Sequence, residues 1–201
     1  MHRQTRDLTE GRPLPLLVSF SLPLMVGNVF QQMYTVVDTA VVGKALGVGA
    51  LAALCASDWL NWMMLGVIQG LTQGFGIMMA QDFGSRQMDR LRRTIGASAV
   101  LSAIGALVLL AVGQVAIAPI LRLLQTPDAI QGDTVLYLRI MFGGVPVVMA
   151  YNLFAGMIRS LGDSKTPLYA MMVASCVNIG LDLLFVLVFH WGIAGAAAAT
   201  L

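Results

Sequence analysis

The chain has 201 residues, of which 58% are hydrophobic and only 11% are charged, and its formal net charge is +2. A soluble globular domain carries about 25% charged residues, so this composition excludes an ordinary soluble protein. Several apolar runs reach the roughly 20 residues that a helix needs to cross a bilayer, and the sequence lacks the alternating pattern of a membrane β-barrel. The composition therefore predicts an all-α, multi-pass membrane protein.

The first segment, residues 1–13, is polar and Arg-rich. We expect a retained cytoplasmic tail, because the apolar run after it is too long for the core of a signal peptide. The first predicted span covers residues 14–42 and contains Pro23, which membrane helices tolerate as a kink. Its second half is unusually polar, with Asn28, Gln31, Gln32, Tyr34 and Asp38. A helix of this kind needs protein or water along its polar face, and we expect it to end in a short turn at residues 43–47.

The second predicted span, residues 50–80, has glycine at every fourth position from Gly66 through Gly70 to Gly74. This spacing predicts close backbone contact with another helix. Asp58 lies near the start of the span beside two tryptophans, which favour the membrane interface, so we favour a position at headgroup level over a role in lining the cavity. We expect a polar loop at residues 81–93 and an uncharged third span at residues 94–118.

The fourth predicted span covers residues 133–158 and contains Pro146 and Asn152. The fifth covers residues 167–189, with Thr166 as the expected N-cap and Pro167 as the first helical residue. The sixth begins at residue 192 and has reached only residue 201 where the sequence stops. So short a segment cannot cross a bilayer at about 1.5 Å per residue. We therefore expect a fragment with an incomplete sixth helix.

The basic residues predict the orientation of these spans. With the N-terminus in the cytoplasm, nine Lys and Arg residues fall on inner segments and three on outer ones, as the positive-inside rule requires. The inner residues are Arg3, Arg6, Arg12, Arg86, Arg90, Arg92, Arg93, Arg159 and Lys165.

Two acids lie inside predicted spans, Asp38 in the first and Asp182 in the fifth. Placing one such charge at the centre of a bilayer costs roughly 2.5–3.5 kcal/mol. Asn178 lies four residues before Asp182, on the same helix face. Together with Thr200 these residues fall at a similar depth, roughly 8–12 Å below the outer surface, with Asn178 one turn deeper. A structural polar contact contributes only about 0.6 kcal/mol, so we predict a cation- or proton-binding site rather than a structural cluster.

Several segments carry a resemblance to a known family. They are Phe20–Leu24, Gln32–Gly43, Gln81–Gly84, Arg159–Pro167 and Asn178–Asp182. No single segment is diagnostic, but in this order and at these positions the chain resembles the N-terminal half of the multidrug and toxic compound extrusion (MATE) transporters over nearly its whole length.

The resemblance implies a twelve-span transporter in two six-helix lobes, of which residues 14–201 form the N-terminal transmembrane lobe and the C-terminal lobe is missing. It implies secondary active efflux by alternating access, in which organic cationic or amphipathic compounds leave the cell in exchange for Na⁺ or H⁺. It places the coupling ion at Asp38, Asn178, Asp182 and Thr200. Secondary polar positions of the cavity are Tyr137, Asn152, Gln32 and Asn28. No cofactor, nucleic acid or enzymatic activity is implied.

Three other functions are alternatives. A lipid-linked glycan flippase of the same superfamily needs a cationic cavity for pyrophosphate, whereas the Arg residues here crowd the inner loops. A membrane enzyme is less favoured, because the sequence has no His-Glu-x-x-His or Gly-x-Ser-x-Gly motif. A purely structural subunit is disfavoured by the two buried acids.

Overall fold

The computed structural model describes residues 13–201, and every regular element in that range is a helix. The elements are α1 (Pro13–Gly84), α2 (Met88–Leu123), α3 (Asp128–Gly143), α4 (Val145–Ser160), α5 (Lys165–Asp182), the π-helix η1 (Leu183–Val188) and α6 (Gly192–Thr200). Three helices are long and apolar enough to cross a membrane, or four if the bent pair α3 and α4 forms one span. The predicted all-α membrane architecture is confirmed. Nearly all of the predicted N-terminal tail lies outside the described residues.

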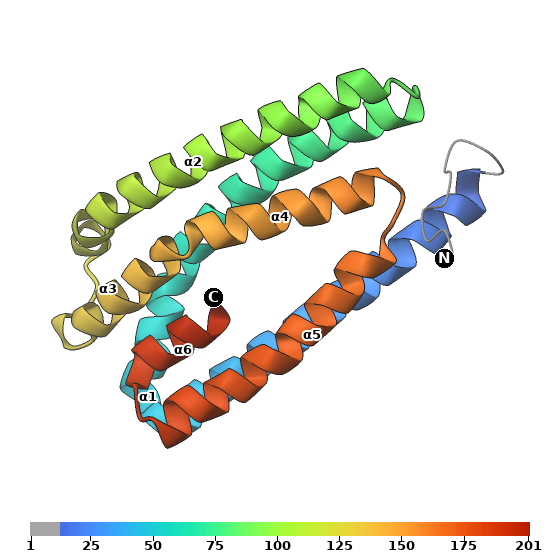
Figure 1. Cartoon of the computed structure of the whole chain (residues 1–201). Coiled ribbons are helices and arrows are strands. Elements are labelled where there is room, and N and C mark those ends of the chain that lie inside the picture. Colours follow the sequence, from blue (N-terminus) through green and yellow to red (C-terminus); the bar gives the residue numbers. More distant parts are fainter. Residues whose placement is uncertain (1–12) are drawn as a thin grey trace.

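Helix α1 consists of two arms joined at Gly47. Its φ of 82° and ψ of −174° lie in a region that glycine adopts without steric cost, and the helix changes direction there. The first arm (residues 13–46) lies beside α5, whereas the second arm (residues 48–84) lies beside α2 (Figure 1). Residues 43–46, which we expected to form a turn, remain helical, so a single residue separates the two arms.

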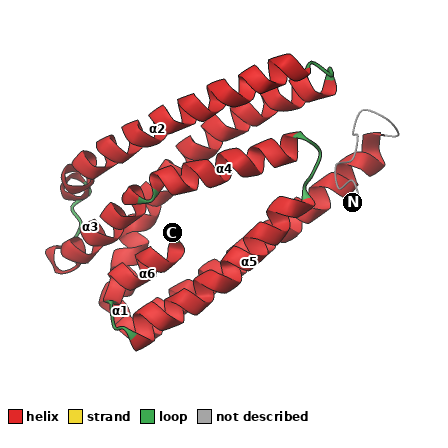
Figure 2. Cartoon of the chain, viewed as in Figure 1, coloured by secondary structure: helices red, strands yellow, loops and turns green. Residues whose placement is uncertain are grey.

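The polar segment after the second arm is much shorter than the expected loop at residues 81–93. Helix α1 continues to Gly84 and α2 begins at Met88, so Arg90, Arg92 and Arg93 belong to the first turns of α2. Helix α2 also runs on through Pro119 to Leu123. Charged residues mark where a helix leaves the apolar layer, and the helix itself can continue beyond that point. Short loops connect α1 to α2, α2 to α3, α4 to α5 and η1 to α6 (Figure 2).

Helices α3 and α4 meet at Gly144 with a bend of 46°. Pro146 falls in the first turn of α4, where a missing backbone N–H leaves no helical hydrogen bond unmade. Gly144 is buried, and a Cβ atom there would overlap the side chain of Leu201. The fourth predicted span is therefore two helices with a glycine at the break.

The closest contact between the second arm and α4 uses glycines other than the predicted ones. A Cβ atom on Gly156 would lie 3.6 Å from the carbonyl oxygen of Thr72, and one on Gly76 would lie 3.8 Å from that of Gly156. A Cβ atom on Gly66, Gly70 or Gly74 would meet nothing within 4 Å. Gly66, Gly70 and Gly74 face outward from the bundle. The prediction that they mediate helix contact is therefore wrong for contacts within the described residues.

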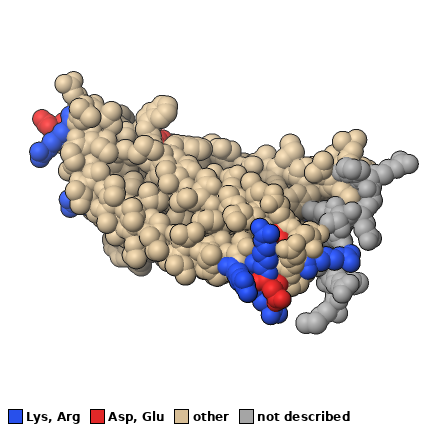
Figure 3. Space-filling view, turned by 90° about the horizontal axis from the view of Figure 1, so that it is seen from above, with Lys and Arg blue, Asp and Glu red and all other residues tan. Residues whose placement is uncertain are grey.

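The charged side chains gather toward the two ends of the elongated molecule and leave an uncharged belt between them (Figure 3). Large apolar side chains are exposed along this belt, including Leu107 on α2, Phe154 on α4 and Val173 on α5. A surface of this kind is stable in contact with lipid or with another apolar protein surface. The orientation of the N-terminus stays a prediction.

Candidate cation-binding site

The four residues of the predicted ion site come from three elements that pack against one another. Asp38 lies on the first arm, Asn178 and Asp182 lie on α5, and Thr200 ends α6. Helix α5 contacts α1 along its length, and α6 contacts both of them near the bend of α1 (Figure 1). Only 1% of Asp182 is exposed, 8% of Asp38 and 7% of Asn178. The fold therefore removes both acids from solvent.

The carboxyl groups of Asp38 and Asp182 lie near enough for their charges to interact. Two negative charges in contact repel each other strongly when little water surrounds them. A buried charge without compensation is among the most destabilising features of a protein interior. This pair therefore favours a bound proton or a bound cation.

Four oxygen atoms at this site have no hydrogen-bond partner among the described residues. They are Oδ1 of Asp38, Oδ1 of Asn178, and both Oδ1 and Oδ2 of Asp182. Buried polar atoms in native proteins nearly always have a partner, and an exception calls for an ion, a water or a functional role. Carboxylate and amide oxygens are acceptors only, so they suit a cation or a donated proton.

The orientation of Asn178 follows from a hydrogen bond to α6. Its Nδ2 donates to the carbonyl oxygen of Ala199 at 2.9 Å, which directs the donor side of the amide to α6 and leaves Oδ1 free. Thr200 follows Ala199 in the chain, and its hydroxyl donates to the carbonyl of Ala196 in its own helix at 2.9 Å. The lone pairs of the Thr200 hydroxyl remain available to a ligand.

Helix geometry changes immediately after Asp182. This residue ends α5, and the next six residues form the π-helix η1. Such wide turns are rare and occur frequently at functional sites. The apolar sequence of residues 183–188 gave no signal for this change, so we had expected an uninterrupted helix to residue 189.

The further polar residues on the predicted fourth span have different surroundings. Tyr137 is buried in the apolar cluster that includes Val42 and Val186, each of which lies four residues beyond one of the site acids. Asn152 donates from Nδ2 to the carbonyl of Val148 in its own helix at 2.9 Å. The structure thus packs Tyr137 beside the site and gives Asn152 only a local hydrogen bond.

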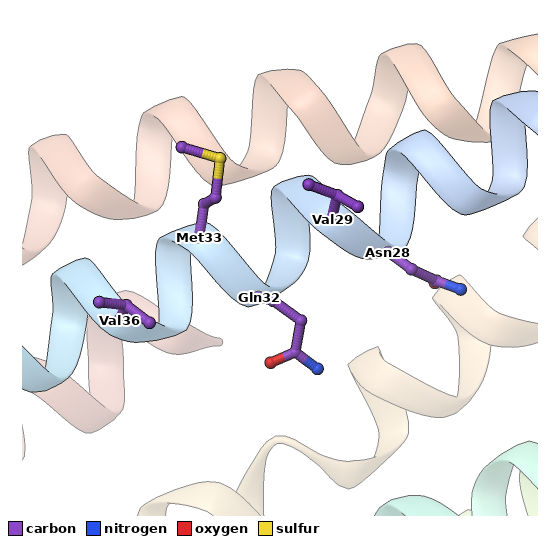
Figure 4. Close-up of a pocket in the computed structure, with 5 residues that line it drawn as sticks. All are labelled: Asn28, Val29, Gln32, Met33 and Val36. Carbon is purple, nitrogen blue, oxygen red and sulfur yellow. The ribbon is translucent and has the colours of Figure 1, made fainter.

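Asn28 and Gln32 lie on the exposed face of the first arm. With Val29, Met33 and Val36 they line an open hollow of about 330 Å³. In this view Gln32 and Asn28 extend to one side of the arm, and Met33 extends to the other (Figure 4). No charged residue lines this hollow, and the surface that faces it is apolar.

A third acid stands near the site. Asp58, on the second arm, is exposed, and its charge interacts with that of Asp38. We had favoured headgroup level for Asp58 over a role in lining the cavity, and neither reading predicted its interaction with Asp38. The break at Gly47 brings the start of the second arm back toward the end of the first. We had treated the two spans separately and so did not predict this proximity.

Comparison with known proteins gives consistent matches. Residues 23–184 match the MatE family model. The chain is 35% identical over 195 residues to the probable multidrug resistance protein YpnP of Bacillus subtilis (strain 168), and this match covers 97% of the chain and 44% of the relative. Two solved structures each have a TM-score of 0.92 and 26% identity, and each match covers 100% of the chain and 44% of the structure. One is a MOP superfamily transporter from Pyrococcus furiosus, and the other is an outward-facing multidrug resistance MATE family transporter. The chain therefore spans less than half the length of these relatives.

Proposed function

This chain belongs to the MatE family, and we propose that it forms the N-terminal lobe of a longer transporter that exports organic compounds in exchange for Na⁺ or H⁺. The matched relatives and structures are more than twice as long as the chain, which supports the presence of a second lobe in the whole protein. Their descriptions as multidrug resistance transporters support small organic compounds as substrates.

The observation that carries the exchange proposal is the set of four buried oxygen atoms without partners on Asp38, Asn178 and Asp182. Intramembrane acids are costly and mark ion pathways or proton relays in membrane proteins. In transporters, such sites gather where helices lose their regular geometry, as α5 does after Asp182. A structural polar cluster would have its oxygen atoms satisfied by neighbouring donors.

Ion binding at this site drives exchange if the ion and the organic substrate prefer different conformations of the lobe. A proton or Na⁺ removes the repulsion between Asp38 and Asp182 and stabilises the packing that holds them together. The substrate then stabilises the other packing, so each ligand lowers the affinity for the other. Two carboxylates with an amide oxygen and a hydroxyl suit Na⁺, and the carboxylate pair alone suits a shared proton.

The hollow on the first arm favours this function over flipping of a lipid-linked glycan. A pyrophosphate group requires cationic partners, and the residues that line the hollow are uncharged. An apolar surface that includes Met33 suits the apolar parts of organic molecules of varied shape, because a thioether adapts to different surfaces.

The test is uptake of a fluorescent organic cation into proteoliposomes that contain the complete transporter, under a Na⁺ gradient or a pH gradient applied separately. Asp182→Asn keeps the shape of the side chain and removes its charge, so we expect ion-driven transport to fall at least tenfold. Asp133→Asn, an exposed acid on α3, is the matched control and should transport at the wild-type rate. Transport by Asp182→Asn at the wild-type rate, with intact ion dependence, would refute the proposal.

A further inference from the structure

We propose that Gly195 on α6 is a positioning residue for the cation site, because its missing side chain lets α6 lie close enough to η1 to hold the Asn178 amide in place. This inference rests on the proposed ion exchange. Gly195 is buried and belongs to none of the residues that offer free oxygen atoms. Gly195 would set the position of α6, and α6 in turn would fix the direction of the Asn178 amide.

The contact at Gly195 is unusually close. A Cβ atom there would lie 3.1 Å from Cβ of Trp191, 3.2 Å from Cβ of Phe185 and 3.2 Å from the carbonyl oxygen of Phe185. All three atoms belong to the backbone or are fixed to it directly. A change of rotamer therefore cannot make room, and the added methyl group has to displace a helix.

The surface that Gly195 touches is held firmly. The Trp191 backbone N–H donates to the carbonyl of Phe185 at 3.0 Å, which closes the turn between η1 and α6. The rings of Phe185 and Trp191 are stacked with their centroids 4.9 Å apart. Ring pairs of this kind contribute about 0.5–1.5 kcal/mol beyond the area they bury. These contacts fix η1 to the residue that precedes α6, so the added methyl group would displace the rest of α6 away from them.

A shift of α6 reaches the ion site through one hydrogen bond. Ala199 lies four residues after Gly195, one turn further along the same helix. Its carbonyl accepts the 2.9 Å hydrogen bond from Asn178 Nδ2. When that acceptor moves by a few tenths of an ångström, the amide is free to rotate and the unpartnered Oδ1 loses its fixed direction.

The experiment measures the Na⁺ or H⁺ concentration that half-saturates transport in the complete transporter. Gly195→Ala should raise this concentration about tenfold, while the half-saturating concentration of the fluorescent organic cation changes less than twofold. Gly132→Ala on α3 is the matched control, because a Cβ atom there meets nothing within 4 Å. It should change neither value. An unchanged ion dependence in Gly195→Ala overturns the inference.

A double-mutant cycle separates positioning from general damage. In an Asn178→Ala background, Gly195→Ala should shift the ion dependence less than twofold, because α6 then has no amide to orient. An equal shift in both backgrounds overturns the inference. If Gly195→Ala does not reach the membrane, Trp191→Ala replaces it in the cycle. This variant loosens the same contact and should shift the ion dependence about threefold, and no shift overturns the inference.

The outcome for Asp182→Asn keeps the two proposals distinct. If Asp182→Asn abolishes ion dependence and Gly195→Ala leaves it unchanged, the exchange proposal stands and the positioning role fails. If Asp182→Asn transports normally, the exchange proposal itself fails.

Discussion

The buried carboxylates in the described part of this protein form two groups of two, and the groups differ in whether their oxygen atoms have hydrogen-bond partners. Asp82 and Asp163 lie at the end of the bundle that holds the α1–α2 and α4–α5 turns, and each accepts hydrogen bonds from neighbouring groups. Asp38 and Asp182 lie near the break in α1, and three of their four carboxylate oxygens have no partner among residues 13–201. Burial of an acid is therefore a weak sign of function by itself, and an absence of donors around it is the stronger sign.

The first pair shows how a buried acid is stabilised in this fold. Asp82 accepts from Arg90 Nε at 3.0 Å and from the Thr94 hydroxyl at 2.6 Å, so it ties the end of α1 to the first turns of α2. Asp163 accepts from the backbone N–H groups of Lys165 and Thr166 at 2.9 and 3.0 Å and from the Thr166 hydroxyl at 2.6 Å. Asp163 thus caps α5, a role that we had assigned to Thr166.

The sharpest contrast between the pairs is expected when each loses its charge. The double variant Asp38→Asn/Asp182→Asn should lose at least tenfold of its ion-driven transport in the proteoliposome assay. Its unfolding temperature should equal or exceed that of the wild type, because the variant no longer buries two repelling charges. A lower unfolding temperature of the double variant would show that Asp38 and Asp182 stabilise the fold, as Asp82 and Asp163 do.

Removing the paired acid at the α1–α2 turn should have the opposite effect. Asp82→Ala loses an ion pair and a hydrogen bond, and we expect a loss of about 2 kcal/mol in the free energy of unfolding. The exposure of Arg90, 68% of its side chain, keeps the value below that of a fully buried pair. Denaturant unfolding in detergent measures the loss, and the exposed Asp89→Ala is the control. Ion dependence of transport should not change, and a change there would contradict the comparison.

A smaller loss is expected at the α4–α5 turn. Asp163→Ala removes the cap of α5 and should lower the free energy of unfolding by about 1 kcal/mol, the typical cost of a lost N-cap. Thr166→Val, which keeps the shape of the side chain and removes one of the three hydrogen bonds, should cost less. If Asp163→Ala has wild-type stability, the three hydrogen bonds make no net contribution to the free energy of unfolding.

The smallest effect is the pH dependence of that cap. Burial raises the pKa of Asp163, but hydrogen bonds from Thr166 and Lys165 and the charge of Lys165 outweigh it, so the pKa lies below its ordinary value of 3.8. The charged form is thus favoured in the folded state, and its contribution is fully present above the ordinary pKa and is lost as the pH falls through the folded pKa. The stability difference between wild type and Asp163→Ala should shrink below about pH 4. A difference that grows in acid would contradict this assignment.

The helical class and the meeting of the site residues follow from rules that act locally on the chain. Apolar runs of bilayer length predict helices, and an acid in such a run predicts a polar partner on another helix. Asp38 and Asp182 do come together, and Asn178 is buried and joined to α6, although the role of these residues in ion binding stays a prediction.

The features that sequence reasoning missed depend on three-dimensional packing. Gly47 differs from Gly66 in its positive φ, and Gly76 differs from Gly66 in its contact with α4. Neither difference is visible in the spacing of the glycines, which selected the wrong set. The π-helix after Asp182 is encoded in an apolar segment that reads equally well as an α-helix. Asp163 caps α5 in place of Thr166, because the helix begins at Lys165, two residues before the expected Pro167.

The uncharged stretch of α2 also determines how this lobe fits its membrane. Between Arg93 and Arg122 the helix has no charged residue, and at about 1.5 Å per residue this stretch is about 42 Å long. The hydrocarbon core of a bilayer is about 30 Å thick, and the whole bilayer with headgroups is about 40–45 Å. Held upright, α2 would place its two flanking arginines at the outer limits of the headgroup layers. In a thinner bilayer α2 has to tilt to keep both arginines hydrated. A change in the tilt of α2 would therefore compensate for hydrophobic mismatch with the host membrane.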